Sequence, residues 1–273
     1  MRTIIAPVNF TPNSNNAAKY AADMAVAAAA DLYLLYVLKL PVSVAEFPLN
    51  DYVFNEMQES GAEALQQLQQ ELEKRTGGEV SVFAHMEIGG VEAKIEEFCK
   101  GKHPFAVIMG ASGHSLETAV AGSNVTAAVQ RLPYPLIVVP EGAAFKKLSK
   151  LVLACDLDDM SNDMAASSAF LRELKGLFHS QFEVVNVQTR KQERRLDAVT
   201  DVQTWKAYLE ETSPDVHVVE MDDVELGIGK YLSDHRADML VVFPKKHPFF
   251  LFHKSQAKRL ALHSSVPIMS IHA

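Results

Sequence analysis

Short apolar segments alternate with amphipathic segments along the first half of the chain. In the amphipathic segments hydrophobic residues recur every three or four positions, as Leu65, Leu68 and Leu72 do, which is typical of helices that bury one face. Most of the apolar segments are continuous, as in parallel strands covered on both sides. They span residues 3–8, 32–37, 79–87, 105–109 and 136–139. This alternation predicts an α/β domain with a doubly wound parallel sheet.

The second half of the chain repeats this order of elements. The region of the first strand aligns with residues 149–157, and the fourth and fifth strands align with residues 238–242 and 266–270. We therefore predict two tandem, five-stranded, Rossmann-like domains, residues 1–141 and 146–273, related by a pseudo-twofold. The strands expected in the second domain span residues 151–155, 182–187, 216–220, 239–242 and 268–271. An additional segment with two prolines, residues 39–55, lengthens the first domain.

Composition narrows the class of protein. A chain of 273 residues, 48% of them hydrophobic, can build two domains that each have a core. The net charge of −8 opposes binding to nucleic acid. No uncharged apolar segment is long enough to span a membrane, and no signal peptide opens the sequence, so we expect a cytoplasmic protein without membrane contact. We expect Cys99 and Cys155 to be inert, small hydrophobic residues.

The candidate binding edge lies at the carboxyl ends of the strands, where ligands bind in open α/β sheets. After the fourth strand, glycines would let backbone amides approach an anion, and a helix opening there would favour phosphate at its amino terminus. We expect the site to comprise Pro7, Val8 and Asn9 after the first strand, Val37 after the second, and Met109, Gly110, Gly113, His114, Gly122, Ser123, Asn124 and Val125 after the fourth.

The order and spacing of these motifs resemble the universal stress protein family, in two tandem copies over nearly the whole chain. The resemblance implies an acid after the first strand and a Gly-x2-Gly-x9-Gly-Ser/Thr motif after the fourth, which ATP-binding members use for adenine and ribose and for phosphate. It also implies that residues 135–139 form a dimerisation strand. We therefore expect ATP or another adenine nucleotide in the first domain, with Mg²⁺ only alongside it, and either a pseudo-dimeric monomer or a homodimer.

The first domain departs from the family pattern in three features. Gly113 and Gly122 are separated by eight residues instead of nine. Asn9 stands at the acid position, where it can hydrogen-bond a ribose hydroxyl but carries no charge. The loop between the first and third glycines has no Lys or Arg, so that only His114 can become cationic, and Glu117 adds a negative charge. The glycines thus either bind a nucleotide through backbone amides or only shape a turn and cap a helix.

The second domain departs from the pattern further. Phe243 and Lys246 replace the first two glycines, while Asp156 retains the acid. Side chains at the glycine positions would block the approach of amides, so no nucleotide is expected there. The aromatic residues of segment 243–255 either fill the empty pocket or form a surface for a protein partner or an apolar ligand; they include Phe249, Phe250 and Phe252. The nearby histidines lack metal-site spacing, so no metal is expected.

No hydrolytic motif accompanies these features. Neither a phosphate-binding Gly-x4-Gly-Lys-Ser/Thr loop nor a Gly-x-Ser-x-Gly turn is present, and we find no base positioned for catalysis. We therefore expect a stress-response binding or regulatory protein whose first domain takes an adenine nucleotide. The alternatives are a slow ATP hydrolase, and an interaction protein or apolar-ligand binder without a nucleotide site.

Overall fold

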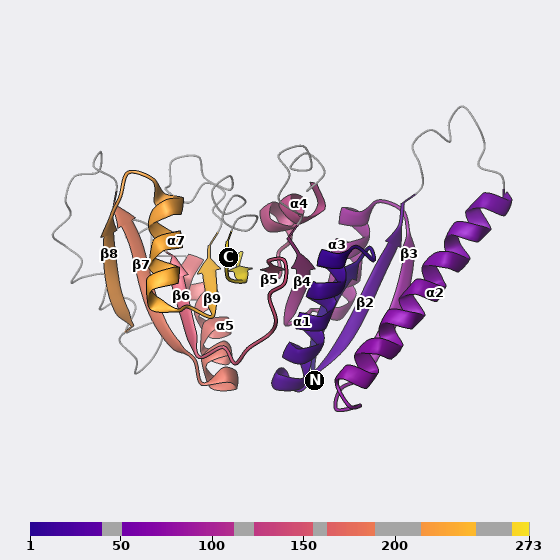
Figure 1. The fold of residues 1–273 in the computed structure, drawn as a ribbon, viewed down its shortest axis with the longest axis horizontal. Helices are drawn as coiled ribbons and strands as arrows, with labels where there is room; N and C mark the ends of the chain where they lie inside the picture. Colours follow the sequence, from indigo (N-terminus) through magenta and orange to yellow (C-terminus); the bar gives the residue numbers. More distant parts are fainter. Residues whose placement is uncertain (40–50, 112–122, 155–162, 189–213, 244–263, 273) are drawn as a thin grey trace. The chain divides into compact units, whose positions relative to one another are not determined.

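The computed structural model describes residues 1–39, 51–111, 123–154, 163–188, 214–243 and 264–272 (Figure 1). They fall into two compact units. The first comprises Met1–Ala128 and Glu141–Phe145, and the second comprises Val129–Pro140 and Lys146–Ala273. The boundaries of these units are defined by contacts between residues. The boundaries of the predicted domains, 1–141 and 146–273, are defined by the repeat in the sequence.

The first unit contains a parallel sheet with the strand order β3-β2-β1-β4. Its elements, in chain order, are β1 (Arg2–Val8), α1 (Pro12–Ala28), β2 (Ala30–Leu38), α2 (Asp51–Arg75), β3 (Val82–Ile88), α3 (Val91–Lys102) and β4 (Ala106–Gly110). A further helix, α4 (Ser123–Arg131), continues from this unit into the second. The alternation of strands and helices confirms the predicted α/β class.

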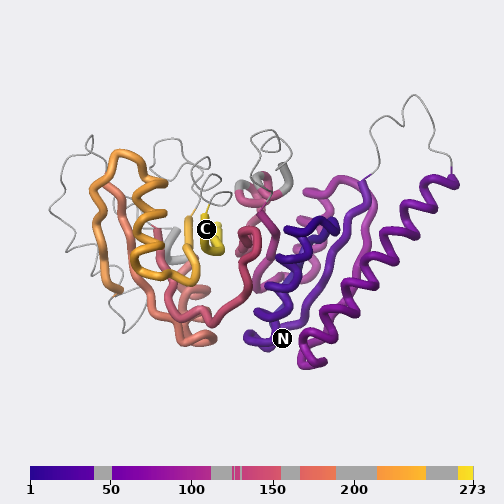
Figure 2. The backbone as a smooth tube through the Cα atoms, in the orientation of Figure 1, coloured from indigo at the N-terminus to yellow at the C-terminus, as the bar shows by residue number. Residues whose placement is uncertain are grey.

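Helices cover both faces of the first unit's sheet. Tyr36 of β2 meets Gly61 of α2, whereas Tyr33, which is on the opposite face because side chains alternate along a strand, packs edge-on against Phe98 of α3. The helices α1 and α2 run side by side on the Tyr36 face (Figure 2). The strands β1, β2 and β4 are therefore largely buried, which explains why they are mostly apolar, whereas β3 at the edge is more exposed.

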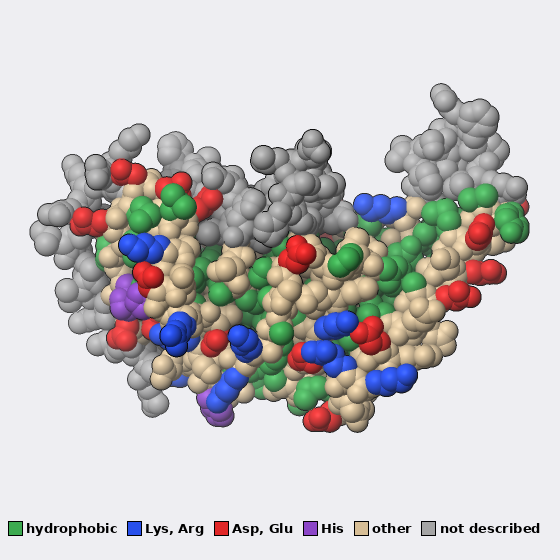
Figure 3. Space-filling view, viewed as in Figure 1, with side chains coloured by type: hydrophobic (Ala, Val, Ile, Leu, Met, Phe, Trp, Pro, Cys, Tyr) green, Lys and Arg blue, Asp and Glu red, His purple; other side chains and the backbone are tan. Residues whose placement is uncertain are grey.

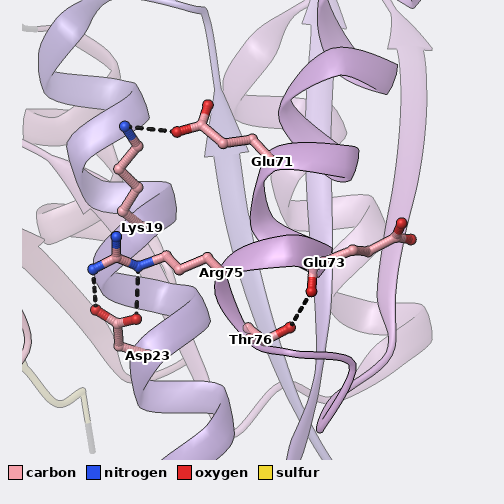
Figure 4. A network of polar contacts seen from close by, with 6 residues as sticks. All are labelled: Lys19, Asp23, Glu71, Glu73, Arg75 and Thr76. Carbon is pink, nitrogen blue, oxygen red and sulfur yellow. Dashed lines mark hydrogen bonds and ion pairs between the residues drawn. The ribbon is translucent and has the colours of Figure 1, made fainter.

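Two ion pairs join α1 to α2. Arg75 binds Asp23 through two bonds of 2.7 Å, one from Nε to Oδ1 and one from an Nη to Oδ2, and Lys19 Nζ lies 2.8 Å from a carboxylate oxygen of Glu71 (Figure 4). Because these side chains are partly exposed, each pair contributes little to stability. The bidentate pair restricts the relative orientation of its two side chains more than the single contact does. Together they fix the carboxyl end of α2 beside α1.

The amino-terminal turns of α2 have few buried side chains. The buried residues of this helix, Gly61, Leu65, Leu68 and Leu72, all lie in its later turns. Tyr52 is 70% exposed and Val53 is 41% exposed, and hydrophobic side chains are visible over this end of the helix (Figure 3). The helical spacing of the leucines is thus confirmed to mark the buried face of α2. The apolar residues Tyr52 and Val53, which precede them, are exposed.

The second unit has the strand order β5-β10-β9-β6-β7-β8. Neighbours are parallel except β5 and β10, which run antiparallel with Ile268 opposite Val138. The elements are β5 (Leu136–Val139), β6 (Lys150–Ala154), α5 (Asp163–Phe178), β7 (Gln181–Gln188), β8 (Asp215–Glu220), α7 (Val224–His235), β9 (Met239–Val242) and β10 (Ile268–Ser270). The final strands of the two repeats therefore pair with each other inside one chain.

Several predicted boundaries are wrong by a few residues. The third strand begins at Val82 and not at residue 79, because Gly77 and Gly78, with φ of 61° and 77°, turn the chain after α2. The additional segment 39–55 includes the start of α2 at Asp51, and its residues 40–50 lie outside the described residues. The strand expected over residues 151–155 is described as far as Ala154.

Candidate functional site

The turn between β1 and α1 is held by side chains that bond backbone groups. Phe10 takes a left-handed conformation, with φ of 62°, and Thr11 follows as the residue that caps α1. The Thr11 hydroxyl accepts a bond of 3.3 Å from the Ser14 amide, and the Ser14 hydroxyl accepts one of 3.0 Å from the Asn9 amide. The first bond satisfies an amide that the start of the helix would otherwise leave without a partner, and the second ties the end of β1 to the helix, so the turn has a defined shape.

Asn9, the residue predicted at the acid position, is exposed at the end of β1. Its Oδ1 accepts two bonds from Thr11, of 2.7 Å from the hydroxyl and 3.3 Å from the backbone amide. Because a backbone amide can only donate, the oxygen and not the nitrogen of the Asn9 side chain must face Thr11. The Nδ2 amino group occupies the other branch of the amide and bonds no group in the described part of the chain.

Gly110, at the end of β4, packs directly against the first turn of α1. A Cβ at this position would overlap the carbonyl oxygen of Asn13 and lie 2.7 Å from its carbonyl carbon. The side chain of Asn13 donates a bond of 2.9 Å to the carbonyl oxygen of Ala111, which ties the two segments together. Packing within the protein therefore explains this glycine, and no bound anion is needed to account for it.

The small residues of α1 make this close approach feasible. Ala17, Ala21 and Ala25 are at most 1% exposed, and the helix lies against β1, β2 and β4. With side chains of one carbon in the contact, the helix axis can approach the sheet closely. The amino terminus of α1 is thereby brought to the carboxyl ends of β1 and β4, which is the edge where the sequence predicts the site.

Most of the predicted apolar site residues belong to the core. Val8, Val37, Met109 and Val125 are between 5% and 7% exposed. Pro7 and Gly110 are half-buried, which leaves Asn9 as the exposed member among the predicted site residues whose burial is described. A ligand at this edge would accordingly meet the Asn9 amide and backbone groups, and little apolar surface from the four core residues.

The remaining predicted site residues lie partly or wholly outside the description. Gly113, His114 and Gly122 fall in segment 112–122, which is not described. Ser123 and Asn124 form the first turn of α4, as the sequence predicts, and the structure describes only their backbone. The phosphate role of these five residues stays a prediction.

The β1 end of the site is electrically neutral. No ionisable side chain occurs between Thr3 and Ala18, so the turn, the helix cap and the first turns of α1 are uncharged. The first turn of α1 has no acidic residue to complement the positive end of its dipole. Anything bound here would meet amide and hydroxyl dipoles and would not meet a carboxylate from this segment.

Comparison with known proteins decides the family. The model of the universal stress protein family matches residues 1–140. The chain belongs to the universal stress protein family. This confirms the resemblance read from the strand-end motifs. No curated protein matches the chain.

Solved structures share the fold of this chain. A universal stress protein from Archaeoglobus fulgidus has a TM-score of 0.75 and 14% identity, over 99% of this chain and 96% of that chain. A putative universal stress protein from Pseudomonas aeruginosa has a TM-score of 0.59 and 13% identity, over 100% and 93%. A universal stress protein solved in complex with cAMP has a TM-score of 0.41 and 14% identity, over 52% and 98%. At these identities the likeness establishes the fold alone.

The second unit of this universal stress protein has a bulky residue where the first has its glycine. Phe243 follows β9 directly and is 7% exposed, so its ring is part of the core. The expectation that no nucleotide binds in this unit stays a prediction. The acid Asp156, Cys155 and the remainder of segment 243–255, with Phe249, Phe250 and Phe252, lie outside the described residues.

Sequence reasoning missed the residues that shape the turn after Asn9. Thr11, Asn13 and Ser14 were not predicted as part of the site, although Thr11 followed by Pro12 is a signal for the start of a helix. Recognising that signal would have placed the helix start three residues after Asn9 and would have indicated a hydroxyl beside it. The contact between Asn13 and Ala111 had no local signal, because the two residues are separated by 98 positions.

Other candidate reactive groups are accounted for by packing. Burial, with a smaller contribution from Glu96, raises the pKa of the Cys99 thiol to about 12, so the thiol is protonated and unreactive in the folded protein.

No group of three metal-binding side chains occurs among the described residues. Within the same residues, no helix is both long enough and apolar enough to cross a membrane.

Proposed function

We propose that this universal stress protein is a cytoplasmic regulatory protein that binds an adenine nucleotide in its first unit. The observation that carries the proposal is Asn9: an exposed amide, held in one orientation by Thr11, at the carboxyl end of β1. Ligands bind at this edge in open α/β sheets. A side chain that is fixed in place but uses only half of its bonding capacity is suited to contact the sugar of a nucleotide.

The proposal divides the site between two segments. Asn9 and the β1 end would contact the sugar, and the backbone amides of the loop after β4, with the amino terminus of α4, would hold the phosphate. A Mg²⁺ ion would be bound only together with the nucleotide, through phosphate oxygens, because the segment from Thr3 to Ala18 has no carboxylate to hold it. In this arrangement, the phosphate-binding part of the site depends on Gly113 and Gly122.

Two measurements test nucleotide binding. Purified protein is denatured and the released small molecules are analysed, and the intact protein is titrated with a fluorescent adenine nucleotide. We expect saturable binding that Gly113→Val or Gly122→Val abolishes, because a branched side chain would block the approach of amides. Asn9→Ala should weaken binding by about 1 kcal/mol, as loss of one neutral hydrogen bond does. Asn55→Ala, on the exposed amino-terminal part of α2, is the matched control.

A second candidate is an interaction protein with closed sites. It is favoured by the burial of Val37, Met109 and Val125 and by the packing contact that explains Gly110. Absence of released nucleotide and of saturable binding would favour this candidate and contradict the first. A slow ATP hydrolase would also bind nucleotide, but would show turnover of ATP in excess over the protein. We expect no such turnover, because the β1 end of the site offers no ionisable group as a base.

A further inference from the structure

Strand β3 is the outer edge of the first unit's sheet, and no strand among the described residues pairs with its free side. Its seven residues are in unbroken register with β2, from Val82 opposite Leu32 to Ile88 opposite Leu38. Free edges recruit further strands, and soluble proteins often interrupt them with lysine, proline or a bulge. Residues 82–88 contain no lysine or proline, and their continuous register leaves no bulge. The edge is thus able to accept another strand.

Two hydrogen bonds at the ends of β3 show which of its backbone groups point toward β2. The Leu32 amide donates a bond of 2.9 Å to the Ser81 carbonyl, and the Gly89 amide donates one of 3.0 Å to the Leu38 carbonyl. Because successive residues of a strand direct their backbone groups to opposite sides, the odd-numbered residues bond to β2. The even-numbered residues direct their amides and carbonyls outward; they are Val82, Ala84, Met86 and Ile88.

Helix α2 bonds to the beginning of this edge and then leaves it. Gln69 Nε2 donates a bond of 2.8 Å to the Val82 carbonyl, which occupies the first outward acceptor. The buried residues of α2 end at Gly61, and toward its amino terminus the helix leans away from β3 (Figure 1). Ala84 and Ile88 are exposed, so the outward backbone groups of this part of β3 are open to a partner.

Large apolar side chains are exposed on both faces of the same edge. Phe83 is 42% exposed and Ile88 is 37% exposed. Since side chains alternate along a strand, these two point to opposite faces of the sheet. The Phe83 ring stacks on Tyr33, with centroids 4.7 Å apart, so its position is defined before any partner binds. A strand added beside β3 would remove part of both side chains from water, which favours association.

A basic and an acidic side chain lie two positions apart on the Phe83 face. His85 Nε2 donates a bond of 2.9 Å to Glu87 Oε1, and Lys94 Nζ lies 3.2 Å from Glu87 Oε2. In an antiparallel pair of identical strands, residues equally far from the twofold axis on either side lie opposite each other. An axis midway between His85 and Glu87 would therefore place each beside its counterpart of opposite type.

We propose that a second copy of this chain binds here, and that the two β3 strands pair antiparallel about a twofold axis at Met86. Each His85 then lies opposite Glu87 of the second copy, and each small Ala84 lies opposite a large Ile88. This fit arises because the strand is complementary to itself, which favours a second copy over a strand of unrelated sequence. The final strand β5 already pairs with β10 inside the chain, so a homodimer has to use another surface.

Other antiparallel registers are less favourable. An axis at His85 would place the two His85 side chains opposite each other, and an axis at Glu87 would oppose two carboxylates, which destabilises a strand pair. An axis at Ala84 would need the Val82 carbonyl, which already accepts the bond from Gln69. The axis at Met86 uses only outward backbone groups that are open and opposes no like charges.

Cysteine cross-linking of the full chain tests the register. In a Cys155→Ser background, Met86→Cys would place two thiols at the axis, where opposite Cα atoms are about 5.5 Å apart and within reach of a disulfide. Ala84→Cys is the matched control, because its two copies would be offset by four residues, about 14 Å. We expect a disulfide-linked dimer from the first variant and not from the second. Val218→Cys, exposed on the edge strand β8, controls for random collision.

Sedimentation over a range of concentrations measures the dissociation constant of the dimer. His85→Glu would oppose two carboxylates, and Glu87→Lys would remove the acceptor opposite His85, so each should raise the constant roughly tenfold. The double variant again opposes an acid to a base and should return to within about threefold of the wild type. Thermal melts verify that each variant folds.

The outcomes decide between this interface and its alternatives. A chain that stays monomeric at every concentration would overturn the proposal, and so would one that binds a foreign strand at β3 but not a second copy. A dimer that Met86→Cys fails to cross-link, or that Ala84→Cys cross-links equally well, would place the interface or its register elsewhere. Failure of the double variant to restore association would overturn the pairing of His85 with Glu87. Nucleotide binding is independent of all these results.

Discussion

Gly110 and the backbone of Asn13 are in direct contact across the junction of β4 and α1, and this contact leaves no space for a side chain at position 110. The glycine belongs to a motif that is read as a phosphate loop, yet its own environment is the first turn of a helix. Steric demands inside the protein and ligand recognition can therefore require the same residue type within one motif. Each glycine of the motif has to be tested separately.

Gly110→Ala should destabilise the protein without any ligand present. The added methyl group would overlap the Asn13 carbonyl, and overpacking of this kind costs about 1–3 kcal/mol. Urea unfolding of the ligand-free protein measures the change. Gly101→Ala in α3 is the control, because its Cβ would meet nothing within 4 Å; there we expect no loss, or a gain of up to about 1 kcal/mol. Equal effects of the two substitutions would contradict the packing explanation.

Thr11→Ala should lower the stability of the protein. It removes the cap of α1, which costs about 1 kcal/mol, and it frees Oδ1 of Asn9 from its bond to the Thr11 hydroxyl. Thr11→Ser keeps both bonds and should restore wild-type behaviour. Thermal denaturation measures the stability change, which should appear in the alanine variant and not in the serine variant. An equal loss of stability in the serine variant would argue against the role given to the hydroxyl.

The two ion pairs between α1 and α2 should differ in strength. A double-mutant cycle on Asp23 and Arg75 should give a coupling of about 0.5–1 kcal/mol, because the pair is bidentate, whereas the cycle on Lys19 and Glu71 should give less than about 0.5 kcal/mol. Urea unfolding at low and high salt measures both couplings. Both should decrease in high salt. A larger coupling for the Lys19 pair would show that the bidentate geometry does not determine the strength of these ion pairs.

Glu183 should make the stability of the second unit depend on pH. Burial alone would raise the pKa of this carboxyl, but hydrogen bonds from Lys150 and Tyr231 outweigh it and hold the pKa below its ordinary value. Because the folded-state pKa is depressed, the stabilisation is present above the ordinary pKa of about 4.3 and is lost as the pH falls through the folded-state pKa. The difference in unfolding free energy between wild type and Glu183→Gln should therefore shrink below about pH 4. A difference that stays constant from neutral pH to pH 3 would contradict this assignment.

Cys99 should react with thiol reagents only when the protein unfolds. Its side chain is fully buried, and burial together with Glu96 raises its pKa to about 12. In a Cys155→Ser background, the rate of modification by a disulfide reagent should be negligible in buffer and rise in parallel with unfolding in urea. Rapid modification of the folded protein would show that the thiol is accessible.

The sequence predicts the central strands well because each is a short, continuous apolar segment between helical patterns. It fails where the deciding contact is remote in the chain. The position of Asn9 follows from its place after β1, but the orientation of its amide depends on Thr11, and the reason for Gly110 lies in Asn13. The start of β3 was misplaced because residues 79–81 continue the turn begun by two left-handed glycines, although their composition fits a strand.

The membership of β5 in the second unit means that no single cut separates the two units. The chain leaves the first unit after Ala128, returns to it at Glu141 and leaves it again after Phe145. A protease that cleaves at Glu141 would divide the chain into two pieces. The amino-terminal piece would contain β5, whose partner β10 lies in the other piece. The nicked protein would accordingly stay associated through backbone hydrogen bonds between β5 and β10, much as strand-complemented fragments do.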